Sequence, residues 1–179
     1  MEGGVTEFVF EWKPYGSNEP LHWRSRDRDH YAILGIFLVN VAEIRREHPF
    51  AYILTNNAAE FDPRLPASSL ASFPQAKLSF DYFLDSSSRV SWIVELGTGD
   101  LVPYYNELVG LVPAPEYWAL LLSRERGLCP WVGEIPFQSG RAEAWVAKML
   151  ERFDAFVQVH EGLFLRVLTR DRIVTDALS

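Results

Sequence analysis

Two strand-like runs, residues 77–85 and 89–96, are separated by only three residues, Ser86, Ser87 and Ser88. A parallel pair of strands needs a crossover connection of about a dozen residues, whereas antiparallel strands can be joined by a tight turn. The short polar join therefore favours an antiparallel hairpin, and the fold must contain at least one antiparallel pair of strands.

Two further runs have the alternation and the β-branched or aromatic content that are typical of strands. Residues 6–12 place Phe8, Phe10 and Trp12 on one face, and residues 50–55 form the second run. We expect both to be strands.

The end of the chain, residues 163–175, fits either a hairpin or a terminal helix. In the hairpin, residues 163–168 and 173–174 would be strands on either side of a polar turn. We favour the hairpin.

Apolar side chains at helical spacing predict two main helices. Residues 29–47 are apolar nearly all round in their middle, which predicts a central helix that ends before Pro49. Residues 30–44 also fit a buried strand because they are rich in β-branched side chains. Residues 141–159 have the clearest amphipathic pattern and predict a C-terminal helix.

Two shorter helices are expected between these two. Asp100 can cap a helix that extends to about residue 112, and Pro115 can open another that ends at Gly127. The two helices would form a helical hairpin. Residues 128–139 contain several proline, glycine and aromatic residues, and we expect them to be irregular.

Strands and helices follow one another here without strict alternation, which predicts an α+β fold. The expected architecture is an antiparallel or mixed sheet packed against the central apolar helix and the C-terminal amphipathic helix. The chain has 179 residues, of which 48% are hydrophobic and 14% aromatic. A chain of this length buries about 70% of its surface on folding, so we expect residues 1–179 to form one domain.

The formal net charge of -7 argues against binding to nucleic acid or to an anionic membrane surface, because phosphate groups would be repelled. The most apolar run, residues 32–39, is far shorter than the ~18 residues of a membrane span. No basic segment followed by an apolar run of signal length comes after Met1, so we expect a cytoplasmic protein.

The single cysteine, Cys129, has no partner for an internal disulfide and is expected to be a packed or loop residue. The four histidines lack the spacing that places two imidazoles on one helical face, so we expect solvated or hydrogen-bonding roles for His22, His30, His48 and His160. The sequence leaves open a three-dimensional metal site that joins His30, His48 and Glu47. We assign no catalytic, cofactor-binding or metal residue, and expect no cofactor.

The segment 92–100 combines an apolar strand, an acidic residue and a G-x-G turn. It resembles the first motif of Rossmann-like S-adenosylmethionine methyltransferases, in which the glycines let the backbone approach the ligand at the end of a strand. The likeness covers nine residues, and Asp100 stands where that family normally has another glycine. The resemblance implies a methyltransferase-like enzyme that uses the turn from Glu95 to Asp100. The alternative is that Gly97 and Gly99 end a hairpin strand.

Several aromatic and charged residues lie in predicted loops or at the ends of elements. Aromatic side chains there can anchor an interface, or they can cover the edges of the sheet. The basic stretch at residues 22–28 can contact phosphate or carboxylate groups, or it can be a solvated loop with local ion pairs. The interface candidates are Trp12, Tyr15, Trp23, Arg24, Arg26, Asp81, Asp85, Glu107, Glu116, Trp131, Glu134 and Phe137.

The acid surplus and the missing catalytic motifs favour a noncatalytic protein-binding module with a basic protein partner. A toxin-neutralising immunity or antitoxin-like inhibitor is one concrete form of such a module. The alternatives are the methyltransferase-like enzyme and a small-ligand carrier with a cavity between sheet and central helix. The sequence does not determine the oligomeric state.

Overall fold

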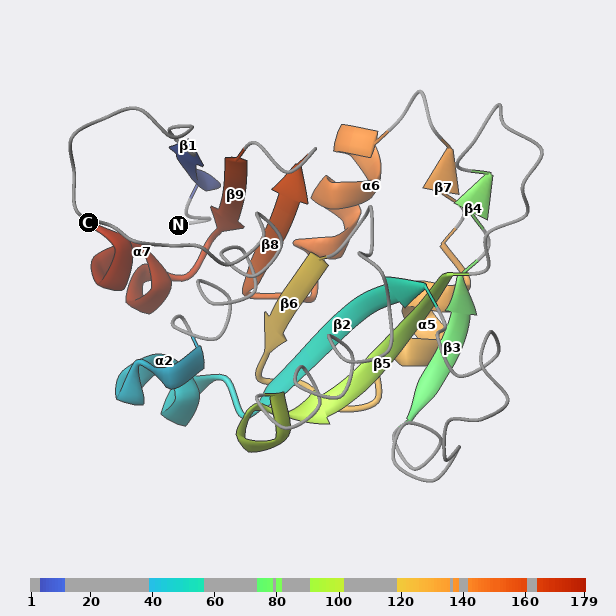
Figure 1. Cartoon of the computed structure of the whole chain (residues 1–179), viewed down its shortest axis with the longest axis horizontal. Coiled ribbons are helices and arrows are strands. Elements are labelled where there is room, and N and C mark those ends of the chain that lie inside the picture. The colour runs from blue at the N-terminus through green and yellow to red at the C-terminus, as the bar shows by residue number, and fades with distance from the viewer. Residues whose placement is uncertain are drawn as a thin grey trace, which may run out of the picture.

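In a computed structural model of the chain, the strands form a seven-stranded sheet in the order β1-β9-β8-β6-β2-β5-β3 (Figure 1). Every pair of neighbours in this sheet is antiparallel. The structure describes residues 4–11, 39–56, 74–78, 80–81, 91–101, 119–135, 137–138, 142–160 and 164–179. The antiparallel pairing predicted first from the sequence is confirmed between β3 and β5. The expected first strand, residues 77–85, is wrong in its bounds, because β3 ends at Leu78 and Phe80–Asp81 pairs with β7 instead. The expected serine turn lies outside the described residues.

The strands of the large sheet are β1 Thr6–Glu11, β2 Phe50–Asn56, β3 Gln75–Leu78, β5 Ser91–Gly97, β6 Ala119–Ser123, β8 Ala155–His160 and β9 Phe164–Thr169. A separate pair of short parallel strands consists of β4 Phe80–Asp81 and β7 Phe137–Gln138. Among the described residues, the helices with defined bounds are α2 Ala42–Glu47, α5 Cys129–Gly133, α6 Ala142–Met149 and α7 Arg172–Leu178. The 3-10 turn η2 Thr98–Asp100 follows β5.

Both faces of the large sheet are buried. In β6, all five residues from Ala119 to Ser123 are buried, and successive side chains point to opposite faces. Leu120 and Leu122 join one hydrophobic cluster, whereas Leu121 joins the other. The sheet is therefore the middle layer of three.

Helices α2 and α7 cover one face, where Ile44 and Val174 are fully buried. Helices α5 and α6 cover the other face with Val132 and Met149 among others (Figure 1). The chain thus combines an antiparallel sheet with helices on both sides, which confirms the α+β class.

The strand β6 corrects the predicted helix from Pro115 to Gly127, and with it the helical hairpin. The run of apolar residues there fits a helix, but it equally fits a short strand that is buried on both faces. Periodicity alone cannot distinguish the two. Gly127 does have a positive φ of 76°, but it lies in the loop after a strand rather than at the end of a helix.

The predicted helix over residues 141–159 is correct only in its first half. Helix α6 ends at Met149, and residues 155–160 form β8. Phe153 and Phe156 fall at helical spacing from Trp145, although they lie outside the helix. All three side chains pack on the same face of the sheet, so they share an apolar pattern without sharing a helix. The β-branched residues of β8 favour the strand, and burial on both faces decides the outcome.

The predicted helix over residues 29–47 is described only from residue 39 onward. Residues 39–40 are helical, so the alternative of a buried strand over residues 30–44 is wrong for this part of the segment. The helix is interrupted at Val41, whose ψ of 117° is not helical, and α2 then runs to Glu47 before Pro49.

At the end of the chain the predicted strand is correct, but residues 173–174 lie in α7. Asp171 caps this helix by accepting a hydrogen bond from the Ile173 backbone N–H.

Asp100 lies inside η2, with Gly97 at the cap position, and the helical residue Leu101 follows it directly. The remainder of the helix expected up to about residue 112 lies outside the described residues, so it stays a prediction.

The expectation that residues 128–139 are irregular is wrong in part, because they contain α5 and β7.

Within the described part of the chain, no helix combines the length and the apolar character that a membrane crossing requires.

Burial of both faces predicts that Leu120→Ala and Leu121→Ala are about equally costly. Each side chain is fully buried, and each substitution should lower the free energy of unfolding by about 2–5 kcal/mol. Urea denaturation measures both values. Val9→Ala on the edge strand β1 is the control, because Val9 is 50% exposed and the change should cost less than about 0.5 kcal/mol. A cheap substitution at either leucine would show that one face of the sheet is open.

Candidate functional site: the polar end of the sheet

Polar side chains gather at one end of the large sheet, where β2 and β8 begin and where β6 and β9 end. Two groups lie there. The histidine cluster consists of His48, Arg124, Asp154 and Asp171. The Glu95 cluster, described further below, lies beside it and involves the same loop after β6.

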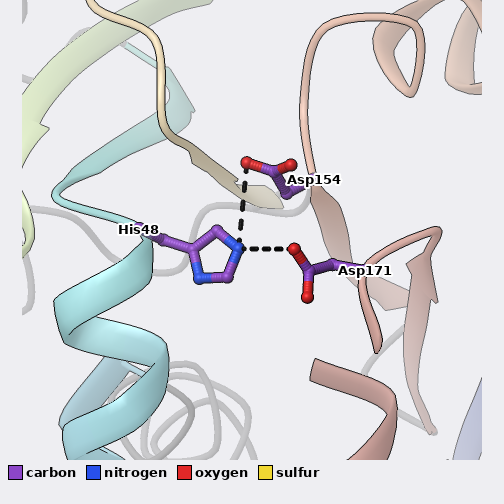
Figure 2. A group of neighbouring side chains, drawn as sticks. All are labelled: His48, Asp154 and Asp171. Carbon is purple, nitrogen blue, oxygen red and sulfur yellow. Dashed lines mark hydrogen bonds and ion pairs between the residues drawn. The ribbon is translucent and has the colours of Figure 1, made fainter. Parts of the chain in front are cut away.

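Four segments that are distant in the sequence supply the histidine cluster. His48 lies between α2 and β2, and Arg124 directly follows β6. Asp154 directly precedes β8, and Asp171 caps α7 after β9. The register explains the meeting of the two aspartates, since Ala155 pairs with Thr169 across β8 and β9. Figure 2 shows the two carboxylates on the same side of the imidazole, both facing one of its nitrogens.

The imidazole of His48 is fully buried and has a partner at each nitrogen. Its Nδ1 lies 3.0 Å from the backbone carbonyl oxygen of Ile44. Its Nε2 lies 3.2 Å from an Asp171 oxygen and 3.8 Å from an Asp154 oxygen (Figure 2). A carbonyl oxygen can only accept a hydrogen bond, which assigns a hydrogen to Nδ1.

Arg124 connects the two carboxylates. One guanidinium nitrogen donates to Asp154 at 2.6 Å, and another donates to Asp171. The backbone N–H of Arg124 also donates to Asp154 at 3.1 Å. This arginine is 45% exposed at its side chain, whereas the Asp171 side chain is 7% exposed, so the cluster runs from the surface to the buried imidazole.

The pKa values of the two aspartates shift in opposite directions. Burial raises the pKa of Asp154, and the negative charge of Asp171 adds to this effect against the attraction of Arg124 and His48. Burial also acts to raise the pKa of Asp171, but hydrogen bonds from Arg124 and from the Ile173 N–H outweigh it and lower the pKa. As the pH falls, Asp154 therefore takes up a proton before Asp171 does.

The Glu95 cluster consists of Tyr52, Glu95, Gly127 and Leu128. The Glu95 side chain is only 4% exposed. One of its oxygens accepts hydrogen bonds from the Tyr52 hydroxyl at 2.9 Å and from the Gly127 backbone N–H at 2.6 Å. Arg126 reaches the other oxygen at 3.3 Å and provides a partly exposed counter-charge. Tyr52 and Glu95 are direct neighbours across β2 and β5, so the sheet register itself creates this pair.

Together the two clusters hold the loop at residues 124–128, which joins β6 to α5. Four backbone N–H groups of this loop donate to side chains: Arg124 to Asp154, Glu125 to Ser123, Gly127 to Glu95 and Leu128 to Tyr52. The Glu125 carbonyl oxygen also lies 3.0 Å from the Tyr52 hydroxyl, so it shares the single hydroxyl hydrogen with Glu95. These polar side chains, together with the apolar packing of Cys129 and Val132 in the hydrophobic cluster, hold α5 on the sheet.

This geometry gives no support to the methyltransferase-like interpretation of residues 92–100. Both neighbours of β5 are antiparallel to it, whereas the Rossmann-like arrangement requires parallel strands at the ligand. Glu95 is engaged with Tyr52 and the loop rather than directed toward a ligand. Gly97 has an ordinary φ of -66°, and a Cβ atom there would meet the end of the exposed Asp100 side chain, which can move away, so this turn does not require glycine.

Four of the twelve interface candidates lie in the described residues. Trp131 and Glu134 belong to α5 and its C-cap, and Asp81 and Phe137 lie on the paired strands β4 and β7. The other eight lie outside the described residues: Trp12, Tyr15, Trp23, Arg24, Arg26, Asp85, Glu107 and Glu116. His48 has the hydrogen-bonding role expected for it. In the three-dimensional site that the sequence left open, its acidic neighbours are Asp154 and Asp171 rather than Glu47, and His30 lies outside the described residues.

Sequence reasoning missed Asp154, Asp171 and Arg124. The apolar spacing predicts a long helix that contains Asp154 and a short one that contains Arg124, whereas in the structure each residue directly adjoins the end of a strand. A strand at residues 155–160 would have placed Asp154 and Asp171 side by side, since antiparallel neighbours joined by a short loop bring the first strand's start next to the second strand's end.

Loss of the Glu95 carboxylate should destabilise the protein. Glu95→Ala removes the acceptor of the Gly127 N–H and the Tyr52 hydroxyl, so we expect the free energy of unfolding to fall by about 2–4 kcal/mol in urea denaturation. Glu125→Ala is the control, since that side chain is 52% exposed and its ion pair with Arg152 contributes less than about 1 kcal/mol. Equal effects of the two substitutions would refute the role of the buried carboxylate.

The thiol of Cys129 should be unreactive in the folded protein. Burial, followed by the charge of Glu95, raises its pKa from 9.0 to about 12. At pH 8 a thiol-specific chromogenic disulfide should therefore label the native protein far more slowly than the denatured one. The associated stability is complete below pH 9.0 and is lost as the pH rises toward about 12. Rapid labelling of the native protein would contradict the described packing.

Comparisons with protein families, curated proteins and solved structures find no significant match for this chain. Its function must therefore be argued from its own residues. The structural features that bear on function are the two polar clusters and the loop and helix that they hold.

Proposed function

We propose that the chain is a noncatalytic protein-binding module that uses the exposed side of α5 to contact a basic protein partner. The observation that carries the proposal is that the loop leading into α5 is attached to the sheet through the Glu95 cluster, and that α5 and its C-cap hold two of the interface candidates. A surface held rigid before binding loses less conformational entropy when a partner binds.

Trp131 is the aromatic anchor of this surface. It is partly buried and packs against the hydrophobic cluster that contains Phe153, with the two ring centroids 6.3 Å apart. The guanidinium of Arg152 lies 5.3 Å from the centroid of the Trp131 ring. Tryptophan and arginine are enriched among the residues that dominate binding energy at protein interfaces.

Two acidic residues lie near this anchor and suit a basic partner. Glu134 at the C-cap of α5 is exposed. Glu125 is also exposed and forms an ion pair with Arg152, whose guanidinium lies over the Trp131 ring. The whole chain carries a formal net charge of -7. Such complementarity increases the association rate and the specificity more than the affinity.

The test is affinity capture with a substituted binding surface. We expect the wild-type chain, immobilised at low salt, to retain a stoichiometric basic protein from a native lysate of its source cells. For the purified partner, Trp131→Ala should weaken binding by about 30-fold or more, as expected at the centre of an interface. Glu134→Lys should mainly lower the association rate and its dependence on salt, measured by surface plasmon resonance.

Glu43→Lys is the matched control. Glu43 is 63% exposed on α2, on the other side of the sheet, and its substitution changes the net charge by the same amount. Binding to the purified partner should change little. The proposal fails if no stoichiometric partner is retained, or if Trp131→Ala binds the partner as tightly as the wild type.

An immunity or antitoxin-like inhibitor is the specific form of module that we propose. This form adds a requirement: expression of the purified partner's gene alone should arrest cell growth, and coexpression of this chain should restore it. A partner whose expression is harmless would exclude the inhibitor form and leave a general binding module.

A further inference from the structure

Three groups that can donate electron pairs meet at His48 Nε2. Because Nδ1 carries the hydrogen that the Ile44 carbonyl accepts, a neutral imidazole presents the Nε2 lone pair to two carboxylates. In the structure, Arg124 offsets the negative charge of both carboxylates from the surface side. A metal ion bound by all three groups can take over this role.

We propose that His48 Nε2, Asp154 and Asp171 form a binding site for a divalent transition-metal ion, and that zinc is the ion that it fits best. Zinc is bound by imidazole nitrogen together with carboxylate oxygen, whereas calcium and magnesium prefer oxygen ligands alone. The Nδ1 contact to the Ile44 carbonyl is the outer hydrogen bond that typically orients a metal-binding histidine.

The spacing of the donor atoms fits this ion. Metal–ligand distances of about 2.0–2.1 Å in a tetrahedral arrangement separate the donor atoms by roughly 3.3 Å. The observed separations from Nε2 are 3.2 Å to Asp171 and 3.8 Å to Asp154, and the three donor atoms lie within 4.8 Å of one another. Small side-chain rotations therefore suffice, and a water molecule would complete the coordination.

Arg124 is the competing cation in this site. Its guanidinium contacts both carboxylates, and its side chain is 45% exposed, so it can turn toward solvent when an ion binds. The site thus exchanges one positive group for another. This arrangement predicts opposite effects for two substitutions: loss of His48 removes a ligand, whereas loss of the Arg124 charge removes a competitor.

The experiment is isothermal titration calorimetry of the chelator-treated full chain with zinc chloride near neutral pH. We expect the wild type to bind one zinc ion specifically, with magnesium chloride giving much weaker binding. Zinc should also raise the melting temperature, because an ion that binds only the folded state stabilises it. Cobalt(II) should give the visible absorption of a low-coordinate site, which reports on the ligands directly.

The variants decide whether the ion is bound at this place, because the chain has three other histidines that could hold zinc. His48→Gln should weaken binding by about 100-fold or more. Arg124→Gln should strengthen it by about 10-fold through loss of the repulsive charge. Arg46→Gln is the matched control, since that side chain is 72% exposed on α2 and belongs to no part of the cluster.

The proposal is overturned if the wild type binds no zinc, if His48→Gln binds it as tightly as the wild type, or if Arg124→Gln binds it more weakly. Should His48→Gln fail to fold, Asp154→Asn replaces it, because the Asp154 side chain is 22% exposed and lies nearer the surface. It should weaken binding and remove the cobalt absorption. An unchanged cobalt spectrum in Asp154→Asn would likewise refute the site.

Discussion

Burial of the sheet on both faces is the constraint on which the rest of this structure depends. Central strands such as β6 carry apolar side chains toward both layers of helices, so polar groups have few places within the sheet. They collect at the strand ends, where the chain leaves the sheet. There a buried polar group must find a partner, because burying it without one costs about 1–3 kcal/mol or more. Glu95 and His48 meet this requirement through groups from distant parts of the chain.

The loop at residues 124–128 connects the two polar clusters to the proposed binding surface. Its backbone N–H groups donate to side chains on both sides, so the two polar clusters share one loop. On one side, the Glu95 cluster determines where α5 and Trp131 lie. On the other, Arg124 supplies positive charge to the aspartates that face His48. The proposed binding surface and the proposed metal site are therefore neighbours, and an ion that displaces Arg124 acts at the start of the loop that leads to α5.

The fold class was predictable from the sequence, but several elements were not. The short serine join identified an antiparallel pair, and local alternation identified β1 and β2. The sequence pattern predicts helices at the leucines of β6 and at the residues of β8. A short run that is buried on both faces lacks the two-residue alternation that identifies a strand. The polar clusters depend on the pairing of β6 and β8 with their neighbours, and this pairing cannot be predicted when the two strands are predicted as helices. Glu95 was noticed only as part of a glycine turn, and its partner Tyr52 is visible only once the β2–β5 register is known.

Hydrogen–deuterium exchange of individual amides tests most directly whether buried side chains hold the loop after β6. Gly127 is exposed and lies in a loop, so its amide would ordinarily exchange fast. Its bond to the buried Glu95 carboxylate is charge-assisted, and such bonds contribute about 1.5–3 kcal/mol, which corresponds to exchange slowed by about 10- to 100-fold. The account predicts this protection for Gly127 in the native protein. Exchange of Gly127 at the rate of an unstructured chain would contradict it.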